Sequence, residues 1–534
     1  PPRSTLFPYT TLFRSLSAIG NPSSWNPYFY TTSVYSFTQA LTKVAGRHEL
    51  RFGYDMNYLE MNHWQPEIGS GPRGAFTFGG NTTSAPGYQP VGGWNGYAGF
   101  LLGLSSSYGK SVQAEEMTTR EWQHGFYIRD RWQVNDKLTL NGGLRFEMYP
   151  VMTRANRGIE RLDFNTWNVL IGGMGGNPSN VGVSPKPLYV VPRLGGAYRV
   201  DDQTVIRAGY GMTINPLPWS RPLRGFYPLT IAFGNSATGY NYITSLEQGI
   251  PVLPTPDLTS GAVPLPSGVN MRTPNPDNVD RATLHQWNLT FERRLPLDIV
   301  TSVAYVGTRT NGGYADIDRN YADPGTGNAG RQYFARSGAA QILDWGAWTT
   351  NKYHSLQVAV NRPFKNGLLL KGAYTWSKAM NMADEDGWTG LTWNHPTQFD
   401  RNYARAGYDR THVFQMGVVY ELPFLRESTS PVAYIIKDWQ VNGIFSAFSG
   451  TPFTMGGNNP TLNAPGAGSI TINQSADLTR INDPGRDSKL WDDSVFTHPT
   501  GLTFGNSGRN AFRYPGVWNL DLSLFRNIPI GRYR

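Results

Sequence analysis

Residues 138–149 read Leu-Thr-Leu-Asn-Gly-Gly-Leu-Arg-Phe-Glu-Met-Tyr, and this segment restricts the possible folds more than any other in the chain. Successive side chains of a β-strand point to opposite faces. Leu144, Phe146 and Met148 therefore share one face, while Arg145 and Glu147 lie on the other. One face is apolar and the other carries full charges. A sheet built from such strands suits a wall between lipid and water.

Similar strands recur along the chain in pairs that are joined by short turns of Gly, Asn, Asp or Pro, residues that favour turns. Between these hairpins run long connections such as Asn215–Ala282 and Phe453–Gly516. Short turns at one end of a sheet and long loops at the other are typical of an outer-membrane barrel, with the turns in the periplasm and the loops outside. The predicted strands are Ser33–Val44, His48–Leu59, Gln123–Val134, Leu138–Tyr149, Leu188–Val200, Thr204–Thr213, Leu284–Arg294, Ile299–Gly307, Tyr353–Arg362, Leu368–Trp376, Thr411–Leu422, Trp439–Phe448 and Trp518–Phe525.

A soluble antiparallel sandwich is the structural alternative, because its strands also alternate. Two features favour the membrane barrel. Most of the predicted strands have about 10–12 residues, which suits a tilted membrane span, whereas strands of globular proteins are usually about half as long. Aromatic residues also cluster near strand ends, as in the girdles at a membrane interface. They are Tyr149, Trp376, Tyr420, Trp439 and Trp518.

Composition excludes other classes of protein. The 534 residues include 16% charged and 13% aromatic residues, with 60 Gly and 38 Pro, which suits strands and turns better than helices. No stretch approaches the roughly 18 consecutive apolar residues of a membrane-spanning helix. The chain has no Cys, which excludes disulfides and thiolate metal sites. The net charge of +9 is spread without basic runs, so no nucleic-acid partner is expected.

A family resemblance rests on these segments: Tyr127–Val134, Lys137–Glu147, Pro192–Arg199, Gln286–Leu289, Ala373–Lys378, Ser449–Phe453 and Trp518–Phe525. In this order they resemble TonB-dependent outer-membrane receptors, most closely the Oar-like branch of that family. The resemblance covers nearly everything after residue 30. It implies an all-β fold, an antiparallel transmembrane β-barrel of the TonB-dependent receptor type.

Barrels of this transporter class have about 22 strands, whereas about 13 are predicted here. We therefore expect residues 33–534 to form a partial outer-membrane β-barrel with long extracellular loops and no plug domain. Residues 16–32 are expected to be a linker or loop. Residues 1–15 resemble a translated sequencing adapter and are expected to be non-native.

By resemblance, the intact receptor would import a scarce solute such as a siderophore, vitamin, glycan or peptide. Its partners would be its own plug domain, a TonB-type energy-coupling protein that binds the N-terminal region, the solute, and outer-membrane lipid and lipopolysaccharide. No cofactor and no enzyme activity are expected, since no catalytic or nucleotide-binding motif stands out. The alternatives are a surface or adhesion protein on the same barrel, and a soluble glycan-binding or glycan-cleaving β protein.

Charged residues on the polar faces of the strands are expected to line a lumen. Tryptophans in the loops are candidates for stacking on a ligand, with small cores inside the loops as the alternative. Asp384-Glu385-Asp386 lacks EF-hand spacing, so a solvated loop is expected there rather than a metal site. His354, His395 and His412 also lack metal-ligand spacing and are expected in the lumen or loops. The lumen candidates are Arg51, Asp55, Arg145, Glu147, Arg207, Glu292 and Asp521, and the loop candidates are Trp345, Trp348, Trp388 and Trp393.

Overall fold

The computed structural model describes residues 28–65, 71–85, 93–219, 226–237, 240–252, 254–385, 390–424, 428, 430–481, 489, 491–526 and 528. Thirteen strands form one antiparallel path, as the alternation predicts. β1 and β27 end this path and do not pair with each other in the described part of the chain, so the sheet is open. The strands are β1 (Phe29–Ala45), β2 (His48–Trp64), β6 (Met117–Gln133), β7 (Leu138–Met148), β10 (Tyr189–Arg199), β11 (Thr204–Ile214), β16 (Thr283–Leu295), β17 (Ile299–Asp318), β18 (Ile342–Lys365), β19 (Leu368–Asn381), β21 (His412–Glu421), β22 (Trp439–Phe448) and β27 (Val517–Arg526).

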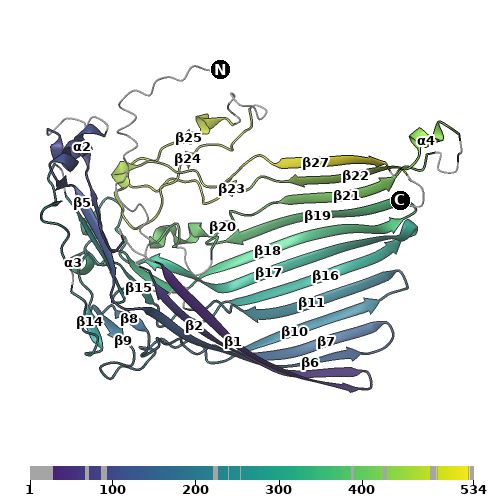
Figure 1. Ribbon diagram of the computed structural model, residues 1–534, viewed down its shortest axis with the longest axis horizontal. Coiled ribbons are helices and arrows are strands. Elements are labelled where there is room, and N and C mark those ends of the chain that lie inside the picture. The colour runs from purple at the N-terminus through teal and green to yellow at the C-terminus, as the bar shows by residue number, and fades with distance from the viewer. Residues whose placement is uncertain are drawn as a thin grey trace.

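Several of the short turns are set by residues that tolerate a left-handed backbone or bond their own chain. The side-chain oxygen of Asn135 accepts hydrogen bonds of 2.9 Å from the backbone amides of both Lys137 and Leu138. Asn366 and Gly367 have φ values of +50° and +76°, as a tight hairpin requires. We call the end of the sheet where the strands are joined by these short turns the turn end, and the opposite end of the strands the loop end (Figure 1).

Predicted and observed strand limits agree within three residues at the turn end, but most of the strands are longer than predicted at the loop end. β17 continues from the predicted Gly307 to Asp318, and β18 begins at Ile342 rather than Tyr353. The physical reason is burial in protein, because Ala315 and Ile317 in the extension of β17 are buried among loop residues. β1 begins at Phe29, within the segment expected to be a linker, while residues 1–15 and 16–27 lie outside the described residues.

One face of the sheet, the apolar face, carries exposed apolar side chains across many strands. Leu144 is 42% exposed, Leu289 54% and Trp376 55%. Exposed apolar area of this extent marks contact with lipid or protein. Trp122 and Trp132 lie ten residues apart on this face of β6. That spacing is about 33 Å along a strand and about 25 Å in height at a tilt of about 40°, which is the height of an outer-membrane apolar band.

The long connections build a second layer at the loop end. Small antiparallel sheets form there, including β5 (Ser107–Gln113) with β12 (Thr230–Ser236), and β8 (Glu160–Asp163) with β9 (Asn168–Ile171) and β14 (Ala262–Pro264). Figure 1 shows these elements gathered beside the ends of the long strands, away from the hairpin turns. They enclose apolar clusters of their own, so the loops are packed structures. None of the helices in the described ranges has the length and apolar character needed to cross a membrane.

Candidate functional site

Strand pairing brings all seven predicted lumen residues to the face opposite the apolar one, which we call the polar face. Directly paired residues of an antiparallel ladder share a face. Arg51 pairs with Arg129, Arg129 with Gly143, and Gly143 with Arg193. Residues an even number of positions apart in one strand also share a face. The pairs that continue across the sheet therefore place the candidates in β7, β11, β16 and β27 on the same face as Arg51. Contact of these residues with a lumen stays a prediction. They are Arg51, Asp55, Arg145, Glu147, Arg207, Glu292 and Asp521.

Three of the seven form one ion-pair group across β2 and β7. Nη1 of Arg145 lies 2.5 Å from Oδ2 of Asp55, and its Nε lies 2.6 Å from Oε1 of Glu147. The hydroxyl of Tyr149 donates to the other oxygen of Glu147 at 2.8 Å. These charges therefore stabilise one another within the wall.

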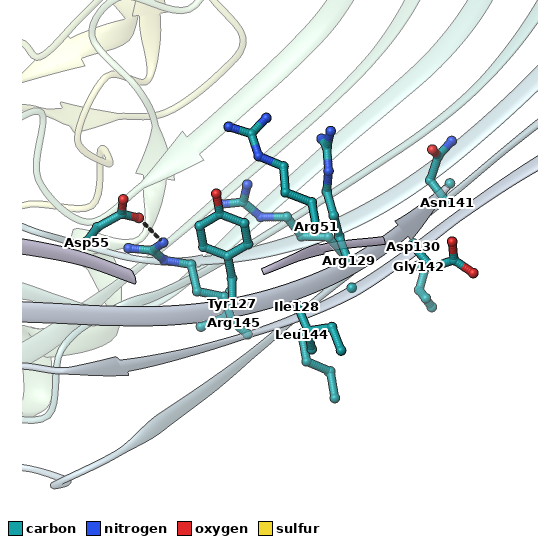
Figure 2. Close-up of a pocket in the computed structure, with 15 residues that line it drawn as sticks. Arg51, Asp55, Tyr127, Ile128, Arg129, Asp130, Asn141, Gly142, Leu144 and Arg145 are labelled. Atoms are coloured by element: carbon teal, nitrogen blue, oxygen red, sulfur yellow. Dashed lines mark hydrogen bonds and ion pairs between the residues drawn. The ribbon is translucent and has the colours of Figure 1, made fainter. Parts of the chain in front are cut away.

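Beside this group, three arginines border a hollow of about 520 Å³ on the polar face. Arg51, Arg129 and Arg193 lie in one row across β2, β6 and β10, with Gly143 of β7 between the last two. Figure 2 shows the guanidinium groups of Arg51 and Arg129 on the side of the ribbons opposite the side chains of Ile128 and Leu144.

The hollow has an excess of positive charge. Glu49 lies 3.5 Å from Arg129, but Arg51 and Arg193 make no ion pair within the described ranges. Nε of Arg51 is buried and has no hydrogen-bond partner there. Gly143 places no side chain in the hollow, and a Cβ atom at this position would be crowded, since it would lie 2.9 Å from the carbonyl oxygen of Ile128. The arrangement is suited to anionic groups.

A buried ion pair joins the polar face to the loop layer, and the sequence analysis missed it. Nη2 of Arg281 lies 2.5 Å from Oε1 of Glu121, and both side chains are 1% exposed. Arg281 also donates to the carbonyl oxygen of Leu217 at 2.6 Å, and Glu121 accepts from the backbone amide of Trp219 at 2.8 Å. The guanidinium lies 4.4 Å from the ring centre of Tyr149. A continuous set of contacts thus links the wall with the 215–282 connection.

Two of the loop tryptophans are core residues, so their prediction as ligand contacts was wrong. Trp345 is fully buried, with its ring centre 4.3 Å from that of Tyr314. Trp393 is also fully buried, and its Nε1 donates to the carbonyl oxygen of Ser469 at 2.8 Å. Neither side chain has surface left for a ligand.

The other two tryptophans have different outcomes. Trp348 is half-buried, donates from Nε1 to the carbonyl oxygen of Asp344 at 3.1 Å, and has the guanidinium of Arg319 over its ring at 5.2 Å. It keeps some exposed surface, and its contact with a ligand stays a prediction. Trp388 lies outside the described residues.

The acidic tripeptide is only partly described, since Asp386 lies outside the described residues. Asp384 accepts from Asn381 at 3.0 Å and from the backbone amide of Gly407 at 2.8 Å, so its carboxylate holds the loop together. No group of three or more His, Asp or Glu side chains that could hold a metal occurs in the part of the chain that the structure describes.

Two of the three histidines lie where they were not expected. His395 is a loop residue, 3.1 Å from Asp323. His354 and His412 lie on the apolar face, however, where their Nδ1 atoms are 2.7 and 2.8 Å from the hydroxyls of Tyr305 and Tyr374. Their prediction as lumen or loop residues was wrong, because each is an even number of residues from an apolar-face side chain of the same strand.

Comparison with known proteins gives a family match over the whole chain. Residues 1–534 match the family described as outer membrane beta barrel domain. A search of curated proteins found no match.

Solved structures similar to this chain include the outer membrane transporter YddB from Escherichia coli, with 8% identity, TM-score 0.43, and coverage of 81% of this chain and 44% of that chain. They also include the FrpB iron transporter from Neisseria meningitidis, with 10% identity, TM-score 0.39, and coverage of 80% and 44%. The ferripyoverdine receptor of Pseudomonas aeruginosa has 11% identity and TM-score 0.38, with coverage of 83% and 41%. The chain spans less than half the length of each of these proteins.

Proposed function

Because this chain belongs to the family of outer membrane β-barrel domains, we propose that it forms the wall of a receptor that imports a scarce solute through the bacterial outer membrane. The family places the chain in the outer membrane, which makes the soluble glycan-binding alternative wrong. In our proposal the apolar face of the sheet lies toward lipid. The solute classes that we consider are siderophores, vitamins, glycans and peptides. Import is a binding and transport activity without catalysis.

The arginine-bordered hollow is the observation that carries this proposal. A structural wall has no need for a buried polar atom without a partner, since such an atom costs free energy, and Nε of Arg51 is one within the described ranges. Arg51 and Arg193 make no ion pair among the described residues, and the hollow between them holds about 520 Å³. An anionic group from solute or plug would supply the missing partner. The polar face therefore lines the import path in our proposal.

The loop layer gives the path its orientation. The long connections lie at one end of the sheet and the tight turns at the other (Figure 1). Outer-membrane barrels keep short turns in the periplasm and long loops outside. We therefore place the loop layer at the cell surface, where a solute first meets the receptor. A plug domain within the barrel and a TonB-type energy-coupling protein would then gate and drive import from the periplasmic side.

Uptake measurements test the proposal. Cells that express the receptor would be given labelled ferric siderophores, cobalamin, oligosaccharides and peptides, with and without the energy-coupling protein. We expect uptake of one class, its loss without the coupling protein, and its reduction by Arg51→Gln with Arg193→Gln. Lys137→Gln is the matched control, because it removes an exposed charge from the tight turn between β6 and β7, away from the hollow. Absence of coupled uptake across all four classes would overturn the proposal.

A surface or adhesion protein is the second candidate, and the packed loop layer favours it. The loops enclose apolar clusters, yet Tyr240 and Tyr242 remain 41% and 51% exposed on them. A rigid surface with exposed aromatic residues suits attachment to another surface. Deletion of the energy-coupling protein separates the two functions, since adhesion would persist and uptake would stop.

A further inference from the structure

The apolar face carries a repeated tyrosine–histidine pair that the import function does not use. In each pair the hydroxyl of a tyrosine lies 2.7–2.9 Å from Nδ1 of a histidine on the next strand of the sheet. Each histidine is two residues before the residue that pairs with the tyrosine. The pairs are Tyr54–His124, Tyr210–His285, Tyr305–His354 and Tyr374–His412.

All four pairs lie at the same depth in the sheet. Each tyrosine is the seventh residue of its strand, counted from the turn end, in β2, β11, β17 and β19. Its height above the turn end is about 15 Å, from six steps of about 3.3 Å at a tilt of about 40°. Each histidine lies two residues further from the turn end than the residue that pairs with its tyrosine, which places it about 20 Å above the turn end by the same spacing. This row therefore approaches the upper boundary of the apolar band.

A cationic patch lies beside part of this row, on the side toward the loop end. Arg309 pairs with His285, and Lys378 pairs with His354 across the ladder, so these side chains share the apolar face. Lys352 pairs with Arg309 and lies two residues beyond His354. Arg309 and Lys378 are each ten residues from the start of their strands. Their height is about 25 Å, the full height of an apolar band.

The patch has no internal counter-charge. Arg309 donates to the side-chain oxygen of Asn311 at 2.9 Å, and the ammonium of Lys352 lies 5.8 Å from the ring centre of Tyr403. Within the described ranges none of the three cations makes an ion pair. Below them on the same strands lie exposed apolar side chains, with Leu356 38% and Trp376 55% exposed. Cations above apolar side chains match the order of groups at a lipid headgroup.

We propose that Arg309, Lys352 and Lys378, with His285 and His354, bind the phosphate groups of a glycolipid in the outer leaflet. Guanidinium and ammonium groups are the side chains that bind phosphate oxygens best. The Nδ1 atoms of both histidines are engaged with tyrosine hydroxyls, which holds each ring in place and leaves Nε2 as the atom for a lipid oxygen. The acyl chains of the lipid would lie on Leu356 and Trp376. This inference goes beyond the proposed function and needs only the membrane location.

Lipid binding to the purified full chain in neutral detergent tests the site. The probes are bisphosphorylated lipid A and the same lipid after removal of its phosphates, with bound lipid counted by native mass spectrometry. We expect tighter binding of the phosphorylated lipid. The triple variant Arg309→Gln, Lys352→Gln and Lys378→Gln should weaken that binding by about tenfold or more, because each basic residue at an anionic membrane surface contributes about a fivefold factor. Binding of the dephosphorylated lipid should not change.

Lys371→Gln is the matched control, since Lys371 lies on β19 seven residues from Lys378 and therefore on the polar face. It should bind both lipids as the parent does. Lys378→Gln alone, which changes one exposed side chain, should weaken binding about fivefold if the triple variant does not fold. Equal affinity of the parent for both lipids, or of the single variant and the parent for the phosphorylated lipid, would overturn the proposal. Displacement of the lipid by inorganic phosphate alone would also overturn the proposal, because it would show that the site binds free phosphate. Failed uptake with intact lipid binding would contradict only the proposed function.

Discussion

Arg281 donates from Nη2 to Oε1 of Glu121 across 2.5 Å, although the two residues are 160 positions apart in the chain. Glu121 belongs to β6, and Arg281 ends the long connection before β16. Both side chains are almost fully buried, so water cannot replace either partner. The pair therefore fixes the base of a surface loop to the wall of the sheet.

Arg281→Met should lower the free energy of unfolding by about 3–5 kcal/mol, because it leaves the carboxylate of Glu121 buried without its partner. Urea titration followed by tryptophan fluorescence measures this change. Lys186→Met is the matched control at the same loop base, since the Lys186–Asp280 pair is exposed, and its effect should stay below about 1 kcal/mol. The combination of Glu121→Leu with Arg281→Met should lose less than Arg281→Met alone. Equal losses in the test and control variants would contradict this role of the pair.

The hairpin of β8 and β9 should depend on pH through Glu160. Burial raises the pKa of Glu160, but the charges and hydrogen bonds of Arg154 and Arg157 more than offset this, so its pKa lies below the ordinary value of 4.5. Oε2 of Glu160 lies 2.7 Å from Nη2 of Arg154. A lowered pKa in the folded state stabilises the hairpin above the unfolded pKa, and this stability is lost as pH falls through the folded pKa.

Hydrogen exchange of the β8 amides measures this effect. Protection should be constant from neutral pH down to about pH 5 and should fall in more acidic solution. Glu160→Gln is the control, because an amide does not titrate in this range. Its hairpin should be less protected at neutral pH and should show no further loss in acid. An identical acid profile in the variant would assign the transition to another group.

The sequence was sufficient for the thirteen strands because their pattern is local. Alternation along β7 alone placed Arg145 and Glu147 on the face opposite Leu144. It could not locate the end of β17, where the register shifts at Gly313 and the alternation breaks while pairing continues. There the neighbouring loops, rather than the residues of the strand, determine how far the sheet extends.

The candidate site was predictable to the same degree. A shared face follows from a period of two residues, so the common face of the seven lumen candidates was predictable, while their contact with a lumen stays a prediction. The partner of Glu121 depends on the path of a long loop, which no local pattern encodes. Trp345 was misassigned because a core tryptophan and a ligand-binding one look alike in sequence. The tyrosine–histidine row did leave a signal, since His124, His285, His354 and His412 each begin the pattern His-x-apolar-x-apolar.

Gly307→Ala should destabilise the sheet by about 1–3 kcal/mol, because the new methyl group must displace a packed ring. A Cβ atom at Gly307 would lie 2.4 Å from Cε2 of Trp287. Gly417→Ala is the matched control in another strand of the same sheet, where nothing lies within 4 Å of the new atom. Its effect should stay within about 0.5 kcal/mol. Urea unfolding in lipid vesicles compares the two, and equal changes would show that Trp287 moves aside freely.

Trp345→Ala should cost about 3–5 kcal/mol, the usual loss when a large core aromatic is removed. Its indole is fully buried between Trp219 and Tyr314, with ring centres 5.6 and 4.3 Å away. Trp348→Ala, three residues further along β18, removes a half-buried ring and should cost clearly less. Limited proteolysis of the loop layer and urea unfolding measure both variants. If Trp345 served a ligand rather than the core, its removal would leave unfolding and proteolysis unchanged and would impair solute binding alone.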